Sequence, residues 1–198
     1  MKNNPANFYN ERLVELEATL KVQKAKSTRI VSLRLVLALV MIVLAYVFIQ
    51  AEQTLVFIVA EVVLLGIFIY LVQEHLKLKK QVRSSQKLIE INKNELKALN
   101  GDFGFTDNGR KYLDYSHRNA FDLDLYGDKS LFQRLNRTTT QEGCDSLAKE
   151  INKQESIDLD EKQSILKELS KKVSWRQEYQ SVGLLEAQNS GYEELKSW

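Results

Sequence analysis

Two long apolar stretches, Leu35–Ile49 and Leu55–Val72, follow each other with only Gln50-Ala51-Glu52-Gln53-Thr54 between them. A helix needs about 20 mostly apolar residues to cross roughly 30 Å of hydrocarbon, and helices at about 30–49 and 54–72 reach that length. Backbone polar groups cannot stay unpaired in lipid, so each stretch is expected to be helical. Because the connection is so short, the sequence predicts a transmembrane helical hairpin.

Two charged residues interrupt these stretches. Arg34 lies near the start of the first helix, where a long side chain can reach the headgroups. Glu61 lies within the second, and an acid at the bilayer centre costs about 2.5–3.5 kcal/mol, whereas each large apolar residue returns roughly 0.3–0.6 kcal/mol. Insertion is therefore favoured. Glu61 could mark an ion path or a helix-pairing contact, but we favour a carboxyl that is placed shallowly or is protonated against its partner helix.

Basic residues flank the hairpin on both sides, whereas the connecting turn carries only Glu52. This pattern predicts that both termini lie in the cytoplasm and that the chain is a multi-pass protein of the cytoplasmic (inner) membrane. A cleaved signal peptide does not fit, because the preceding segment is long and acidic in part. The flanking cations are Lys21, Lys24, Lys26, Arg29, Arg34, Lys77, Lys79, Lys80, Arg83 and Lys87.

The overall charge and the cysteine count exclude some classes of protein. The chain has 198 residues and a net charge of +2, so broad nucleic-acid binding by this chain alone is not expected. The cations gather instead beside the expected membrane, where anionic lipid attracts them. Cys144 is the only cysteine, which rules out an intrachain disulfide and suits a reducing compartment.

Helical periodicity extends from the hairpin in both directions. A helix is expected over 8–34, and a stalk helix over 74–100 with weaker polar members of its repeat at Ser85 and Asn92. We expect these helices to pair as an antiparallel cytoplasmic stalk; a coiled coil with another chain is the alternative. The apolar residues of the two repeats are Tyr9, Leu13, Leu16 and Leu20, then Leu78, Val82, Ile89, Leu96 and Leu99.

The C-terminal half reads as short helices after an irregular connector. Asn100-Gly101 should end the stalk helix, and 102–118 should form a loop with one or two short strands. Two short apolar faces follow, the first made of Leu131, Phe132 and Leu135 and the second, after Gly143, of Leu147, Ala148 and Ile151. A capping box at Asp158 and Glu161 then precedes one longer helix, which is ended by Gly183 and has a buried stripe of Ile165, Leu166, Leu169, Val173 and Tyr179. A short helical piece is expected between Gly191 and Trp198.

The fold class expected from these signals is mostly α. The predicted regions are a cytoplasmic amphipathic helix at 1–29, the transmembrane hairpin at 30–73, the stalk helix at 74–100, the connector at 101–121 and a helical domain at 122–198.

Two short motifs suggest phosphate or metal chemistry. Gly127-Asp128-Lys129-Ser130 lacks the contiguous Gly-Lys-Ser of a phosphate-binding loop, so a turn capped by Ser130 is the better interpretation. Asp122 and Asp124 would share one face of an extended segment and could serve Mg²⁺ binding or a membrane enzyme. No apolar strand precedes them and no convergent lysine accompanies them, so this interpretation is disfavoured.

Other candidate residues also have plainer explanations. His75, His117 and Cys144 lack zinc-ligand spacing; His75 is expected at the solvated membrane edge and Cys144 in packing. Asn136-Arg137-Thr138 matches a glycosylation acceptor, which a cytoplasmic location makes accidental. Trp175, Arg176 and Tyr179 could form a stacking surface, but their helical spacing favours core and rim positions. We assign no catalytic, cofactor-binding or metal-binding residue.

Residues 120–182 resemble the beginning of the core domain of the DNA mismatch-repair MutS family. The matching positions are Asp122-Leu123-Asp124-Leu125-Tyr126-Gly127, Ser130-Leu131-Phe132, Leu135-Asn136-Arg137-Thr138-Thr139-Thr140, Gly143, Leu147-Ala148, Asp160-Glu161-Lys162-Gln163 through Leu169, and Trp175-Arg176-Gln177-Glu178-Tyr179. The whole chain is similar to the N-terminal part of membrane-anchored, MutS-related bacterial proteins, in which a membrane hairpin replaces the mismatch-reading domain.

The resemblance implies structural duties for its residues. Arg137 would bond the C-terminal carbonyls of a short helix, Thr138 or Thr140 would cap the next helix, and Gly143 would permit close approach. ATP, Mg²⁺ and double-stranded DNA would be bound by downstream domains. This chain has no phosphate-binding loop, no Phe-x-Glu mismatch-reading element and no DNA clamp, so it is expected to be one portion of a longer ATPase.

The partners expected are therefore the lipid bilayer and, through missing domains, DNA; a second copy of the chain is a further candidate, and no small-molecule substrate is evident. The competing hypothesis is a small membrane-hairpin scaffold that binds another protein through the stalk and residues 120–182.

Overall fold

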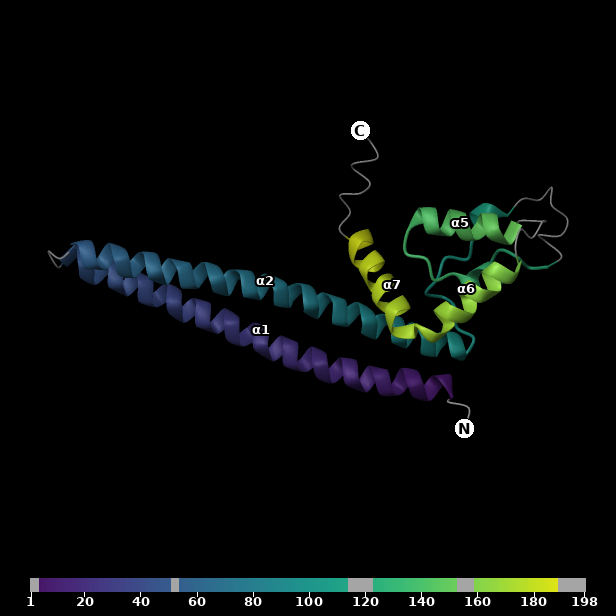
Figure 1. The fold of residues 1–198 in the computed structure, drawn as a ribbon, viewed down its shortest axis with the longest axis horizontal. Coiled ribbons are helices and arrows are strands. Elements are labelled where there is room, and N and C mark those ends of the chain that lie inside the picture. The colour runs from purple at the N-terminus through teal and green to yellow at the C-terminus, as the bar shows by residue number, and fades with distance from the viewer. Residues whose placement is uncertain (1–3, 51–53, 114–122, 153–158, 189–198) are drawn as a thin grey trace, which may run out of the picture. The chain divides into compact units, whose positions relative to one another are not determined.

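The computed structural model describes residues 4–50, 54–113, 123–152 and 159–188 (Figure 1). Within these ranges every regular element is helical and no strand occurs, which confirms the all-α class. The chain divides into a hairpin unit, Glu15–Gln86, and a helical unit formed by Met1–Val14 with Lys87–Trp198. The elements are α1 (Pro5–Gln50), α2 (Thr54–Leu99), the 3₁₀ helix η1 (Arg110–Tyr112), α4 (Leu131–Leu135), α5 (Gln141–Asn152), α6 (Leu159–Lys171) and α7 (Val173–Gln188).

Within the hairpin unit, α1 and α2 lie side by side and antiparallel (Figure 1). Their less exposed residues alternate in steps of three and four, which is the 3.5-residue repeat of two helices packed in a left-handed coil. We call this set the seam. It consists of Leu16, Leu20, Gln23, Ser27, Ile30, Arg34, Leu37, Met41, Leu44 and Phe48 from α1, and of Glu61, Leu64, Phe68, Leu71, His75, Leu78, Val82 and Ser85 from α2.

Three contacts fix the alignment of the two helices across the seam. Ser85 Oγ donates to Gln23 Oε1 at 3.0 Å, and Ser27 Oγ lies 3.4 Å from His75 Nδ1. The Arg34 guanidinium carbon lies 5.2 Å from the centre of the Phe68 ring. The last two contacts place Ile30 level with Val72, so the two predicted inner ends of the membrane segments come to the same height.

The apolar segments of the hairpin remain uncovered. The described helices Pro5–Phe48 and Ile58–Leu99 are each long and apolar enough to cross a membrane, and no residue of their most apolar windows is buried within the chain. Side chains such as Leu35, Ile42 and Val62 are more than 60% exposed. The cores of soluble proteins bury such surfaces, so this exposure favours lipid as their surroundings. Arg34 and Glu61 both lie on the seam, half-buried, instead of on these outer faces.

The end of α2 follows the sequence prediction, whereas the connector after it does not. Gly101 has a φ of 80° and its N–H bonds Ala98 O, while the N–H of Asp102 bonds Lys97 O, which completes a Schellman cap. The one or two strands expected over 102–118 are absent from 102–113. Asp102, Asp107 and Asn108 use their side-chain oxygens to accept the backbone N–H two residues later, and these local turns replace a strand ladder.

The core of the helical unit forms around Phe132, which is fully buried. The rings of Tyr112 and Tyr126 each lie 5.5 Å from the Phe132 ring, and Ala148 of α5 closes the cluster. Gly109 permits this arrangement because its φ is 68° and an added Cβ would lie 2.6 Å from the Phe132 ring. Three aromatic side chains, each worth several kcal/mol when buried, thus anchor a small domain.

The prediction that Leu131, Phe132 and Leu135 of α4 form one buried apolar face is wrong for two of the three residues. Leu131 and Leu135 are 44% and 53% exposed, and only Phe132 of the predicted three is buried. Residues one turn apart share a face, so burial of Phe132 brings Asn136 inward and turns Leu131 with Leu135 outward. The face predicted on α5 is confirmed, since Ala148 is buried and Leu147 and Ile151 are half-buried, although α5 begins at Gln141, before Gly143.

The single long helix predicted near the C-terminus is two helices, α6 and α7, separated at Lys172. The change of direction leaves Ile165, Leu166 and Tyr179 of the predicted buried stripe exposed. Gly183 does not end α7; it lies inside the helix where an added Cβ would lie 2.1 Å from Thr139 Oγ1, so it permits close packing. The predicted cap at Asp158 and the piece after Gly191 lie outside the described residues.

Candidate functional site

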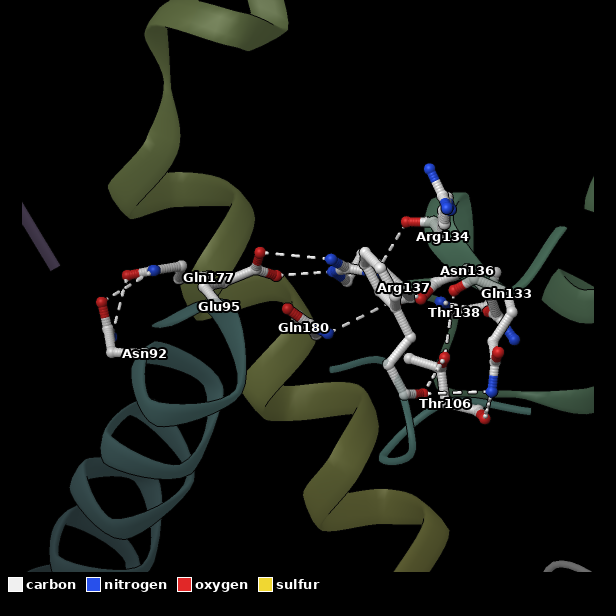
Figure 2. A network of polar contacts seen from close by, with 11 residues as sticks. Asn92, Glu95, Thr106, Gln133, Arg134, Asn136, Arg137, Thr138, Gln177 and Gln180 are labelled. Carbon is white, nitrogen blue, oxygen red and sulfur yellow. Dashed lines mark hydrogen bonds and ion pairs between the residues drawn. The ribbon is translucent and has the colours of Figure 1, made fainter. Parts of the chain in front are cut away.

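A network of polar side chains joins three helices of the helical unit, and we call it the polar junction (Figure 2). Its first part is a reciprocal amide pair: Asn92 of α2 donates to Gln177 of α7 at 3.3 Å, and Gln177 donates back at 3.0 Å. Arg12 of α1 donates its Nε–H to the same Gln177 oxygen at 3.1 Å. Asn92 is fully buried and Gln177 is 5% exposed. In such surroundings paired amides are stabilising and an unpaired one is costly.

The second part is the ion pair between Arg137 and Glu95. Arg137 donates from Nε at 2.6 Å and from Nη2 at 3.3 Å to the two carboxylate oxygens, a bidentate arrangement that fixes geometry as well as charge (Figure 2). Its Nη1 bonds the backbone oxygens of Arg134 and Asn136 at the end of α4. The expectation that Arg137 bonds helix C-terminal carbonyls is therefore confirmed, and Glu95 is an additional partner.

The residues after Arg137 form a capped turn into α5. Thr140 Oγ1 accepts the N–H of Gly143, which confirms that Thr140 caps this helix. An added Cβ at Gly143 would lie 3.2 Å from Thr138, so the close approach that Gly143 allows is to this turn. Asn136 is 3% exposed and its Oδ1 accepts from the N–H and hydroxyl of Thr138, which gives the Asn-Arg-Thr stretch a structural role.

Gln133 ties the connector to the same region. Its Nε2 donates to Phe103 O at 3.2 Å and to Thr106 O at 3.4 Å, and Thr106 Oγ1 donates to Gln133 O at 3.0 Å (Figure 2). Ser130 caps α4 by accepting the N–H of Gln133, as predicted for the turn over 127–130.

Beside the junction is a groove of about 560 Å³ whose wall carries Tyr9, Arg134, Arg137, Arg176 and Tyr179. Burial and the neighbouring Glu95 carboxylate raise the pKa of Tyr9, so its phenol stays protonated at neutral pH. The groove thus presents cationic and aromatic side chains around one carboxylate.

A separate cluster holds the start of α5 against η1. Tyr112 donates its hydroxyl to Asp145 at 2.5 Å, and Gln141 Nε2 donates to both. Burial, followed by the Asp145 hydrogen bond, raises the pKa of Tyr112 to about 12. The same hydrogen bond, with that from Gln141, lowers the pKa of Asp145.

The structure places most sequence candidates in structural roles. Asp124 has a φ of 47°, which contradicts the extended segment proposed for the aspartate pair; Asp122 and His117 lie outside the described residues. His75 lies on the seam beside Ser27, so its expected position as a merely solvated residue is wrong. Cys144 packs at the core, 2.8 Å from Thr138 Oγ1.

The remaining candidates do not form a metal site or a core stripe. In the part of the chain that is described, no three His, Cys, Asp or Glu side chains gather as a metal site. Trp175 and Tyr179 stack on each other at the surface, 55% and 73% exposed, so the core-and-rim prediction for them is wrong.

The sequence analysis did not predict that Glu95 would pair with Arg137, or that Gln177 would bond both Asn92 and Arg12. Asn92 had the one available signal, a polar residue at a position of the apolar repeat. Such a residue needs a buried partner, but periodicity gives no indication that the partner lies 85 residues away.

No protein-family model, curated protein or solved structure matches this chain.

Proposed function

We propose that this chain is the N-terminal membrane-anchoring and partial core region of a MutS-like ATPase related to DNA mismatch repair. Residues 30–73 cross the cytoplasmic membrane as a hairpin with both termini in the cytosol. The helical unit begins the core domain, and ATP and DNA bind to domains further along the parent protein.

The observation that carries the proposal is the contact between Arg137 and Glu95. Arg137 belongs to the Leu-Asn-Arg-Thr stretch that resembles the MutS family, and Glu95 lies on α2, the helix that continues from the second apolar segment. A bidentate pair resists both sliding and rotation. The stretch that resembles the core is thereby attached directly to the helix that leaves the membrane.

The membrane part of the proposal is supported by charge and exposure. The outer faces of both apolar segments are uncovered, whereas the seam holds Arg34 and Glu61. Cations flank the inner ends of both segments, which favours a cytoplasmic location for both termini. A tether of this kind would keep a DNA-processing machine at the membrane and would transmit movement of α2 to the core.

Orientation is tested by labelling single cysteines in intact cells. In a Cys144→Ser background, a cysteine replacing Glu52 should react with a membrane-impermeant maleimide from outside. A cysteine replacing Asp102 should react only after the membrane is permeabilised. The opposite pattern would overturn the orientation, and release of the wild-type chain from vesicles by alkaline carbonate would overturn the anchor itself.

The link to MutS is tested on the natural gene. The coding region should continue past Trp198 and encode a Gly-Lys-Ser or Gly-Lys-Thr phosphate-binding loop, and its membrane-bound product should hydrolyse ATP in a DNA-dependent manner. A natural reading frame that stops at Trp198 and gives a stable, active product would contradict the proposal.

The alternative is a membrane-hairpin scaffold, and the exposed Trp175–Tyr179 stack on α7 favours it. Aromatic side chains of this kind are typical of protein-binding surfaces. The sequence of the downstream frame separates the two functions, because a scaffold needs no phosphate-binding loop.

A further inference from the structure

Six cations surround the hairpin just inside its predicted membrane segments, and we call them the basic collar. They are Lys24, Lys26 and Arg29 of α1 with Lys79, Lys80 and Arg83 of α2. All six are exposed, and within the described residues none of them forms an ion pair. The one acid at this level, Glu74, is paired with Lys77 at 2.9 Å. The collar is therefore a concentration of uncompensated positive charge.

The alignment of the helices places the two halves of the collar at adjacent heights, directly below the apolar segments. Ser27 lies beside His75, so Lys24 is level with the turn that follows Lys77, and Arg29 is one residue from the inner end of the apolar segment. Lys79 and Arg83 are level with Gln23 and Thr19, so with a rise of about 1.5 Å per residue the collar spans about 15 Å along the helix axes. This is comparable with the range of roughly 10 Å over which charges interact at moderate salt.

The cations also point in different directions around the pair. Successive helix residues are rotated by about 100°, so Lys24, Lys26 and Arg29 flank the seam of α1 on both sides and at its back. Lys79, Lys80 and Arg83 spread over the outer half of α2 in the same way. A helix that binds duplex DNA gathers its cations on one face. A band of charge on several sides of the hairpin instead matches a flat leaflet that surrounds it.

Arg34 lies just above the collar, on the seam between the two helices. Its Nε is the one buried side-chain nitrogen or oxygen without a hydrogen-bond partner among the described residues. It lies four residues, or about 6 Å, beyond Ile30 into the apolar segment. The guanidinium faces the Phe68 ring across the seam, so Arg34 is not counted as part of the collar.

From these observations we propose that the collar binds the headgroup phosphates of anionic phospholipids in the cytoplasmic leaflet. This inference depends on the proposed membrane hairpin and adds the class of lipid. The surface potential of anionic lipid attracts cations held within a Debye length of it.

The test is the lipid selectivity of the full chain reconstituted in vesicles, measured by electron spin resonance with spin-labelled phosphatidylglycerol and phosphatidylcholine. We expect phosphatidylglycerol to associate about fivefold more strongly, and the ratio to approach one at about 1 M salt, where the Debye length is about 3 Å. The collar variant is K26Q/R29Q/K79Q/R83Q, and the control removes four exposed lysines of the helical unit in K97Q/K149Q/K167Q/K171Q.

The collar variant should lose the selectivity and the control should keep it. Equal association of both lipids with the wild type, or selectivity that survives in the collar variant, would overturn the proposal. Displacement of phosphatidylglycerol by duplex DNA at low salt would also overturn it. If the collar variant does not insert into vesicles, the salt dependence of the wild type tests the proposal instead, and a lipid selectivity that persists at about 1 M salt would overturn it. Carbonate extraction of the wild type reports on the hairpin separately, so the two proposals can fail independently.

Discussion

The hairpin unit and the helical unit are held together in different ways. In the hairpin unit, one repeated seam joins two helices that are consecutive in the sequence. Each contact joins two residues at similar distances along the chain from the turn between the helices. In the helical unit, the decisive contacts join residues far apart in sequence, such as Asn92 with Gln177 and Glu95 with Arg137. A repetitive interface tolerates the loss of one member, whereas a junction made of single paired groups does not.

The largest expected loss concerns the aromatic core. Phe132→Ala should lower the free energy of unfolding of the helical unit by about 3–5 kcal/mol, because the side chain is fully buried between two tyrosines. Leu131→Ala, at an exposed neighbour, should change it by less than about 0.5 kcal/mol. Chemical denaturation in detergent, followed by near-ultraviolet circular dichroism, measures both. Equal effects would show that Phe132 is not the centre of the core.

The amide pair should respond to single and double substitution in opposite ways. Gln177→Leu leaves the buried Oδ1 of Asn92 without its donor and should cost about 1–3 kcal/mol, whereas replacing both residues with leucine should recover much of this loss. A double-mutant cycle on unfolding measures the coupling. Additive losses would mean that the two amides do not depend on each other.

Two glycines sharpen the comparison between the units. Gly183→Ala should cost about 1–3 kcal/mol because its Cβ would collide with Thr139, and Thr139→Ala should relieve part of that loss. Gly66→Ala in the hairpin unit is the matched control, since nothing lies within 4 Å of the added Cβ. It should cause no loss of thermal stability. Similar losses at both positions would contradict the close contact with Thr139.

The smallest effect appears only in alkali. The pKa of Tyr112 is raised to about 12 by burial and by Asp145. Between pH 10 and pH 12 the unfolded chain gives up this proton while the folded chain keeps it, so the stability that Tyr112 contributes is lost as pH rises. The free energy of unfolding, measured over this pH range, should fall less steeply with pH in Tyr112→Phe than in the wild type. Tyr9 and Tyr126, whose pKa values are also raised, should keep part of the slope, and an unchanged slope would exclude Tyr112 as its source.

The sequence by itself determined the two long helices and the residues by which they pair. Leu78, Val82 and Ser85 were predicted from spacing and lie on the seam, and Ile89 and Asn92 of the same repeat are buried, whereas Leu99 is 50% exposed and was predicted wrongly. Gly101 as the helix end and Ser130 as a cap were likewise predicted, and the resemblance implied Thr138 or Thr140 as a cap and Arg137 at the end of α4. These features are local, because a helical period, a cap or a left-handed turn depends on residues within one or two turns of chain.

The tertiary structure alone decided which polar residues meet and which apolar faces are covered. Glu95, Gln177 and Arg12 carry no local sign of their partners, and the exposure of Leu131, Leu135 and Tyr179 followed from the direction that each short helix takes. The strands expected after Gly101 gave way to turns made by Asp102, Asp107 and Asn108. Short helices present little periodic signal, so their faces are chosen by packing against distant segments, and periodicity does not encode that packing.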